Sequence, residues 1–302
     1  MLDPAALMRL RTLEMRARVV VEGYWKGIHR SPYHGFSVEF SEYRPYVPGD
    51  DPRFIDWKVL ARSDRVFLKK FEDETNLRCT LVVDQSRSMS FAAAGHSKAD
   101  YASTLAATLG QFLMEQGDAV GLATFDEKLD QWIPPRNRPG HLRRLMVHLD
   151  NAPRGNGTDF TGPLEHFAGQ ERRRGLLVLI SDLLSPVENL LTTLGHLTAL
   201  GHDLMVFQVL DRAELDFTFD RATHFRDAES GEEIYVDPGA ARESYLSKLR
   251  AHLDAVRHAC ESRRADYRLV ATDEPMEQVL YDFVKGREKA KPRARRSRSS
   301  PR

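Results

Sequence analysis

The chain has 302 residues, of which 41% are hydrophobic and 29% charged, and its formal net charge is zero. This composition is typical of a water-soluble globular protein with one large core and room for an appended module. The longest apolar run, residues 176–180, is far shorter than the roughly 20 residues of a membrane-spanning helix. The N-terminus lacks the features of a signal peptide, and neither Cys79 nor Cys260 lies in a C-x-x-C pair. We therefore expect a cytoplasmic protein with free, buried thiols and no membrane span.

The N-terminal part, residues 1–75, differs in character from the rest. Asp3 and Pro4 form a helix start, and apolar residues at helical spacing predict an amphipathic helix over residues 4–22 that docks on the main domain. Residues 31–75 contain aromatic residues, Pro-Gly turns and short strand-like pieces at 36–40 and 65–68. We therefore predict an N-terminal helix followed by a small β-rich appendage.

From residue 76 to 284 the pattern alternates between strands and helices, which predicts an α/β domain with a mostly parallel sheet covered on both faces. A tight turn at 126–127 joins two of the strands, so one of these is expected to be an antiparallel edge. Residues 214–236 read as an insertion with strands at 216–219 and 233–236 around a Ser-Gly turn. The predicted strands of the sheet are 77–84, 119–125, 128–133, 176–181, 203–210 and 266–271, and the helices are 98–116, 140–149, 162–172, 187–200, 241–264 and 275–284.

The C-terminal residues 285–302 concentrate positive charge. They hold nine Lys or Arg and one Glu, a net charge of +8, so the remaining chain carries −8. The segment has almost no apolar residues to bury, and we expect a disordered, solvated tail. Weak contact with nucleic acid, anionic lipid or an acidic partner is the alternative.

Two of the predicted strands end in an aspartate. An apolar run leads to Asp84, with Ser86 and Ser88 at alternate positions after it, and a second run leads to Asp182. Ligands of open α/β sheets bind beyond the carboxyl ends of the strands, and oxygen donors of this kind suit Mg²⁺ or Mn²⁺. If the two strands are neighbours, a bound cation relieves the repulsion between the two carboxylates. The alternative is that Asp84 and Ser86 merely cap the next element.

A flexible Gly-Asn-Gly-Thr-Asp loop at 155–159 presents the hydroxyl of Thr158. With it, the chain resembles the von Willebrand factor type A domain, whose metal-ion-dependent adhesion site reads D-x-S-x-S, then a distant Thr and a distant Asp. The resemblance implies a Rossmann-like, doubly wound sheet that binds one Mg²⁺ (or Mn²⁺) and leaves a coordination position open to a partner's Glu or Asp. The matching residues are Asp84, Ser86, Ser88, Thr158 and Asp182.

The run YRPYVPGDDPRFIDW at residues 43–57 resembles the N-terminal signature of the bacterial family catalogued as "domain of unknown function 58". The resemblance extends from about His34 to about Phe283. It implies that the partner is a MoxR-type AAA+ ATPase or its substrate, and that the chain is an adaptor or chaperone-like companion. We interpret the signature as structural, with partner recognition as the alternative; its polar and aromatic residues are Asp50, Asp51, Arg53, Asp56 and Trp57.

These features together predict a metal-dependent protein-interaction module and not an enzyme. A metal-independent scaffold of the same fold is one alternative. A Mg²⁺-dependent phosphohydrolase with Asp84 as nucleophile is another, but Ser86 stands where such an enzyme needs a second carboxylate, and no basic residue for a phosphate is evident. The sequence also has no phosphate-binding loop of the G-x-x-x-x-G-K-[ST] type.

Overall fold

The computed structural model describes residues 2–30, 43–45, 67–69, 77–93, 95–150, 161–170, 173–219, 223–226 and 233–295. The chain forms two compact units, Met1–Lys26 with Leu77–Arg302, and Gly27–Asn76. The predicted division after residue 75 places the N-terminal helix with the signature segment, whereas this grouping places most of the helix with the sheet. In the smaller unit, β1 (Tyr43–Pro45) pairs antiparallel with β2 (Phe67–Lys69). The predicted strand at 36–40 and residues 46–57 of the signature lie outside the described residues.

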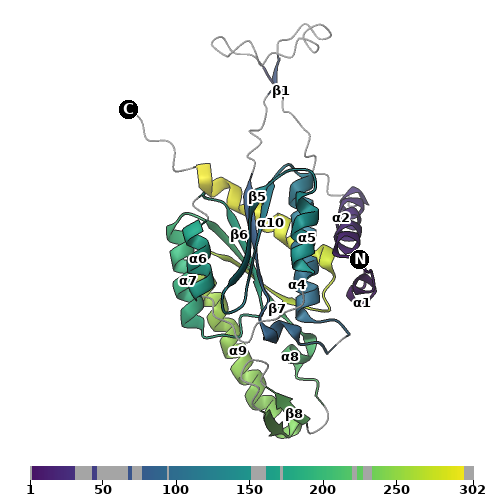
Figure 1. Cartoon of the computed structure of the whole chain (residues 1–302), viewed down its shortest axis with the longest axis vertical. Helices are drawn as coiled ribbons and strands as arrows, with labels where there is room; N and C mark the ends of the chain where they lie inside the picture. Colours follow the sequence, from purple (N-terminus) through teal and green to yellow (C-terminus); the bar gives the residue numbers. More distant parts are fainter. Residues whose placement is uncertain are drawn as a thin grey trace. The chain divides into compact units, whose positions relative to one another are not determined.

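A six-stranded sheet forms the centre of the larger unit (Figure 1). Its strands are β3 (Arg78–Asp84), β4 (Ala119–Phe125), β5 (Leu129–Arg136), β6 (Leu176–Ser181), β7 (Asp203–Leu210) and β10 (Asp266–Ala271). In space the order is β10-β7-β6-β3-β4-β5, and every neighbouring pair is parallel except β4 with β5. The predicted mostly parallel sheet with one antiparallel edge is therefore confirmed.

Helices cover both faces of this sheet. They are α4 (Lys98–Glu115), α5 (His141–Leu149), α6 (Thr161–Gln170), α7 (Val187–Ala199), α9 (Pro238–Ser262) and α10 (Met276–Arg295). Figure 1 shows α6 and α7 on one side of the sheet and α4 and α5 on the other. The central strands β3 and β6 are almost entirely buried, as expected for parallel strands with helices above and below. The α/β fold class predicted from the alternating pattern is confirmed.

The N-terminal helix predicted over residues 4–22 is instead two helices, α1 (Pro4–Met8) and α2 (Leu13–Arg30). The guanidinium of Arg16 explains the break, because it donates to the main-chain oxygens of Met8 and Leu10 at 2.8 and 2.9 Å. These carbonyls lie at the last residue of α1 and two residues beyond it, where no further helical turn supplies a partner. The apolar stripe of α2 docks on α4, where the rings of Trp25 and Phe112 stack at 5.6 Å.

The insertion after β7 also differs from its prediction. The segment expected as a strand at 216–219 begins in a short helix, α8 (Arg212–Asp216), and Phe217 then takes a left-handed backbone conformation. A capping box explains this helix: the carboxylates of Asp211 and Glu214 each accept a hydrogen bond from main-chain N–H groups at its start. The strand at Glu233–Val236 (β9) is present and pairs antiparallel with β8 (Thr223–Arg226).

The basic tail is helical over its first part. Helix α10 continues through Arg295, eleven residues beyond the predicted end at 284, so the prediction of disorder is wrong for residues 285–295. Two effects favour the extension: Lys, Arg, Glu and Ala are good helix formers, and positive charge is stabilising at a helix C-terminus. Residues 296–302 lie outside the described part of the chain. None of the described helices combines the length and hydropathy needed to cross a membrane.

Candidate functional site

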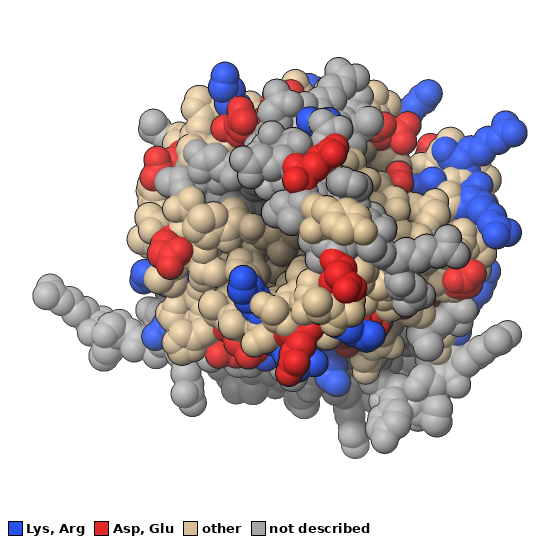
Figure 2. All heavy atoms as spheres, turned by 90° about the horizontal axis from the view of Figure 1, so that it is seen from below, with Lys and Arg blue, Asp and Glu red and all other residues tan. Residues whose placement is uncertain are grey.

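The two predicted aspartates leave the same edge of the sheet from adjacent strands. Strands β3 and β6 are parallel neighbours, with Val83 opposite Ile180, so Asp84 ends one strand, and Ser181 ends the other with Asp182 directly after it. Both carboxylates are buried, at 1% exposure each. The condition on which the sequence argument for a shared cation depended, that these strands are neighbours, is met. Figure 2 views this end of the larger unit and shows a recess near its centre, with both acidic and basic residues around it.

Asp84 is held by two hydrogen bonds that fix both of its oxygens. The N–H of Ser86 donates to Oδ1 at 2.8 Å, and the hydroxyl of Ser181 donates to Oδ2 at 2.5 Å. The first bond closes a tight turn after β3, and the second joins the ends of β3 and β6. Ser181 is a site residue that the sequence analysis missed, although its position beside Asp84 follows from the parallel register.

The two serines of the motif bring their hydroxyls together. Ser86 Oγ lies 3.1 Å from Ser88 Oγ, at the start of the short 3₁₀ helix η2 (Arg87–Ser90). Ser86 occupies the N-cap position, yet its side chain makes no capping hydrogen bond, so this part of the capping alternative is not observed. In an octahedral site with bonds of about 2.1 Å, adjacent ligand atoms lie about 3 Å apart. The observed separation therefore suits two neighbouring ligands as well as a hydrogen bond.

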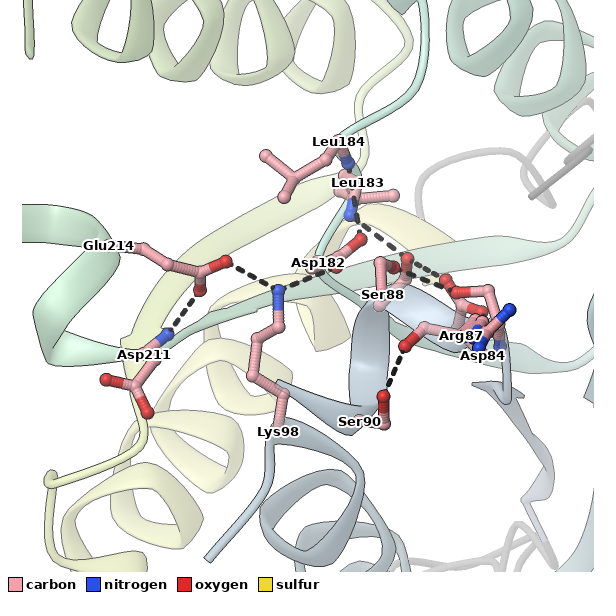
Figure 3. Close-up of polar contacts among 12 residues, drawn as sticks. Asp84, Arg87, Ser88, Ser90, Lys98, Asp182, Leu183, Leu184, Asp211 and Glu214 are labelled. Atoms are coloured by element: carbon pink, nitrogen blue, oxygen red, sulfur yellow. Dashed lines mark hydrogen bonds and ion pairs between the residues drawn. The ribbon is translucent and has the colours of Figure 1, made fainter. Parts of the chain in front are cut away.

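Asp182 carries a partner that the sequence analysis did not anticipate. The ammonium of Lys98 donates to Asp182 Oδ2 at 2.8 Å and to Glu214 Oε1 at 2.8 Å (Figure 3). The side chains of Lys98 and Asp182 are 1% and 2% exposed, so this is a buried ion pair. The other oxygen of Asp182 accepts a weaker hydrogen bond from the N–H of Leu184 at 3.3 Å.

Two sequence signals point to Lys98 and Glu214 in retrospect. Lys98 lies on the same helical stripe as the inward-facing residues of α4, since Tyr101 and Leu105 follow it at spacings of three and seven. Glu214 closes the Asp-x-x-Glu capping pattern that begins at Asp211. Neither signal identifies the partner of the ammonium, because Lys98, Asp182 and Glu214 are brought together only by the fold.

The main chain beyond β6 is held in an unusual conformation. Leu183 is a non-glycine residue with a φ of 53°, a left-handed value that costs free energy and occurs preferentially at functional sites. Three hydrogen bonds hold the turn: Leu183 N–H to Ser181 Oγ at 3.0 Å, Gln208 Nε2 to the oxygen of Asp182 at 2.8 Å, and His252 Nε2 to the oxygen of Leu183 at 2.7 Å. These hydrogen bonds fix the main chain of the turn and thereby the position from which the Asp182 side chain extends.

The electrostatics of the site are unbalanced. Burial and the charge of Asp182 raise the pKa of Asp84 to about 7, although the hydrogen bonds from Ser181 and Ser86 act to lower it. Burial also raises the pKa of Glu214, whereas the charges of Asp182 and Glu214 outweigh burial and raise the pKa of Lys98. When all four side chains are ionised, three carboxylates face one ammonium. The excess of two negative charges matches one divalent cation.

The described donors fit a hydroxyl-rich site for a hard divalent cation. Asp84, Ser86 and Ser88 present oxygen atoms on one turn, and no three His, Cys, Asp or Glu side chains in the described ranges form a metal cluster of their own. Thr158, the remaining predicted ligand, lies outside the described residues. The structure also changes the assessment of the phosphohydrolase alternative. A basic residue is present after all, but both contacts of Lys98 are carboxylates.

Comparison with solved structures finds similar chains of low sequence identity. BatB from Bacteroides thetaiotaomicron is 14% identical, with a TM-score of 0.47, and the match covers 70% of this chain and 99% of that one. The SpRpn10 VWA domain is 13% identical, with a TM-score of 0.40, covering 68% of this chain and 93% of the domain.

Comparison with protein sequences finds a relative along nearly the whole chain. The uncharacterized protein Rv1480 of Mycobacterium tuberculosis is 30% identical over 290 residues, which cover 94% of this chain and 90% of that protein. The uncharacterized protein YeaD of Bacillus subtilis is 25% identical over 142 residues, 47% of this chain and 32% of its own length. A family model described as "protein of unknown function DUF58" matches residues 42–255. With more than half of its length matched by that model, the chain belongs to the DUF58 family.

Proposed function

We propose that this protein is a metal-dependent protein-interaction module that captures an acidic residue of a partner protein. The observation that carries the proposal is the arrangement around Asp84: a buried carboxylate beside two facing hydroxyls, in a cluster of three carboxylates and one ammonium that has two excess negative charges when fully ionised. Burial of unbalanced charge is costly, and a protein offsets it by protonating the carboxylate or by pairing it with a cation.

In this proposal Asp84, Ser86 and Ser88 hold one Mg²⁺ or Mn²⁺, directly or through water. Thr158 completes the set by its place in the sequence motif, and Asp182 binds the ion or one of its waters. The ion supplies a Lewis-acidic position to which a carboxylate from outside can bind. Ser181 orients Asp84 for this task, because its hydroxyl donates a hydrogen bond to Asp84 Oδ2 at 2.5 Å.

For the partner we propose a MoxR-type AAA+ ATPase or a substrate of one, on the basis of the family resemblance carried by residues 43–57. The role is that of an adaptor or chaperone-like companion, without catalysis by this chain. Capture through an acidic side chain requires an open surface near the site, and Figure 2 shows a recess on the face of the molecule seen from below. The exposed Leu184, 46% accessible, lies two residues from Asp182.

The first experiment measures metal binding by the full chain. Mn²⁺ is titrated into the wild-type protein and into Asp84→Asn at pH 8, with free Mn²⁺ followed by electron paramagnetic resonance. The proposal requires saturable binding of one ion by the wild type and loss of that binding in Asp84→Asn. Asp254→Asn, which changes an exposed carboxylate on α9, is the matched control and should bind like the wild type.

The second experiment measures partner capture. The tagged full chain is used in pull-downs with the purified MoxR-type ATPase from the same organism, with Mg²⁺ or with EDTA. Retention that depends on Mg²⁺ and is lost in Asp84→Asn supports the proposal. Equal retention with EDTA would show that the interaction does not use the ion.

A metal-independent interaction module is the second candidate, and one observation favours it. The ammonium of Lys98 contacts Asp182 at 2.8 Å and balances its charge, so the protein itself offsets part of the negative charge that a metal ion would offset. Under this alternative the recess binds its partner by ordinary polar and apolar contacts. The absence of Mn²⁺ binding together with EDTA-resistant pull-down would identify it.

A further inference from the structure

Lys98 lies beside the proposed metal site without belonging to the sequence motif. It is the first residue of α4, and its ammonium is shared between Asp182 and Glu214, each at 2.8 Å. Its stem is completely covered, and Phe91 lies against it with the ring centroid 5.8 Å from the ammonium. Figure 3 shows Lys98 extending between the turn after β6 and helix α8, on the other side of Asp182 from Asp84.

We infer that Lys98 is a fixed internal cation that offsets the charge of Asp182 and thereby sets how tightly the site holds a divalent ion. This inference rests on the proposed metal-binding function and deepens it. Asp84 then remains the carboxylate whose charge is available to the ion, and the ion keeps more of its own positive charge. A more electrophilic ion binds an incoming carboxylate more strongly, so Lys98 favours partner capture over tight storage of metal.

The location of the lysine supports a role for its charge. A cation at a helix N-terminus opposes the helix dipole, and taking an ammonium out of water carries a large desolvation penalty. A buried ion pair is often no more stable than well-packed apolar residues of similar volume. Stability alone therefore does not account for Lys98, whereas the tuning of a neighbouring ionic site does.

Glu214 is positioned to divide the ammonium between two carboxylates. Its other oxygen accepts a hydrogen bond from the main-chain N–H of Asp211 at 2.8 Å, as part of the capping box of α8. The anchor holds Glu214 in place independently of Lys98. Removal of Glu214's charge should leave the ammonium entirely to Asp182, and removal of the ammonium should leave Asp182 entirely to the metal.

The test compares Mn²⁺ affinity among variants of the full chain at pH 8, by electron paramagnetic resonance. We expect Lys98→Met to bind Mn²⁺ at least tenfold more tightly than the wild type, and Glu214→Gln to bind it several-fold more weakly. Lys128→Met is the matched control: it removes one exposed lysine from the turn between β4 and β5 and should leave the affinity unchanged. A purely structural role for Lys98 predicts weaker binding in Lys98→Met, because a loosened site loses affinity.

The double variant Lys98→Met/Glu214→Gln covers the case in which Lys98→Met does not fold, since it leaves one fewer buried carboxylate unpaired. It should also bind Mn²⁺ more tightly than Glu214→Gln alone. The inference would be overturned if the wild type binds Mn²⁺ but neither Lys98→Met nor the double variant binds it more tightly than its reference. The proposed function would then remain intact. No binding in the wild type or in any variant would overturn the metal-dependent function itself, and the inference with it.

Discussion

Ser181 and Asp84 form a cross-strand hydrogen bond at the edge of the sheet. The hydroxyl of Ser181 donates to Asp84 Oδ2 at 2.5 Å, and the same oxygen of Ser181 accepts the N–H of Leu183 at 3.0 Å. One hydroxyl thus fixes both the carboxylate that ends β3 and the strained turn that follows β6. The two halves of the candidate site are coupled through this one side chain, which is fully buried.

Replacement of Ser181 by Ala should therefore be costly. The change leaves Asp84 Oδ2 and the N–H of Leu183 without these partners, and an unsatisfied buried group costs about 1–3 kcal/mol. The free energy of unfolding, measured by urea denaturation, should fall by that amount. Ser90→Ala is the control, because Ser90 is exposed and bonds only within its own turn; its effect should stay within about 0.5 kcal/mol. Equal effects of both changes would contradict the coupling.

Asp84 should make the metal-free protein less stable as the pH rises. Its pKa is raised from 3.8 to about 7 in the folded state, so the folded protein holds a proton there that the unfolded chain has released. The stability that this group contributes is present below about pH 4 and is lost as the pH rises through 7. Asp84→Asn removes the titration. Relative to the wild type in EDTA, it should gain about 2–3 kcal/mol between pH 5 and pH 8.

Thermal or urea unfolding at several pH values measures this gain, and Asp254→Asn is the control for an exposed carboxylate. Parallel profiles for the wild type and Asp84→Asn would show that Asp84 does not carry the effect. Added Mg²⁺ should stabilise the wild type at pH 8 by about 2.7 kcal/mol when its concentration is 100 times the dissociation constant, and should not stabilise Asp84→Asn.

The hydroxyl of Ser88 should contribute to metal affinity without contributing much to folding. It lies 3.1 Å from Ser86 Oγ and is only partly buried, so Ser88→Ala removes a ligand at small structural cost. We expect Mn²⁺ affinity to fall about tenfold, or about 1.4 kcal/mol, with little change in the midpoint of unfolding. Ser90→Ala, two residues along η2, should bind Mn²⁺ like the wild type. An unchanged affinity in Ser88→Ala would remove Ser88 from the ligand set.

His252 should hold the turn after β6 from helix α9. Its Nε2 atom lies 2.7 Å from the main-chain oxygen of Leu183, the residue with the left-handed backbone. His252→Ala should lower the free energy of unfolding by about 1–2 kcal/mol and speed amide hydrogen exchange at Leu184. His258, on the same helix but exposed, supplies the control variant His258→Ala. Faster exchange in both variants would indicate a general effect on α9 and not a contact with the turn.

The fold was predictable because its signals are local. Apolar runs such as 176–180, bounded by turn residues, indicate buried strands, and their alternation with helical stripes indicates a parallel sheet. The errors occur where hydrogen bonds from particular side chains to the main chain, and not the spacing of apolar residues, decide the conformation of a segment. Arg16 ends α1 by donating to carbonyls behind it, and the capping box of Asp211 and Glu214 starts a helix that ends at Asp216, the first residue of the segment expected as a strand.

The candidate site divides in the same way. Asp84, Ser86 and Ser88 lie within five residues of one another, so the chain itself supplies a turn that presents oxygen atoms. The sequence placed Asp182 beside Asp84, at the carboxyl ends of the strands, only on the condition that β3 and β6 are neighbours, and the structure shows that they are. Thr158 remains a prediction, because it lies outside the described residues.

The amino-acid sequence by itself determined the α/β class, the strand ends that carry carboxylates, and the membership of the chain in its family, because these depend on short-range patterns of residues. Only the tertiary structure decided which charges meet. Lys98, Asp182 and Glu214 are separated by 84 and 32 residues along the chain, yet their side chains share one buried ion-pair network. The physical reason is that the packing of helices on the sheet, and not residue type or spacing, decides which ionic groups are buried together.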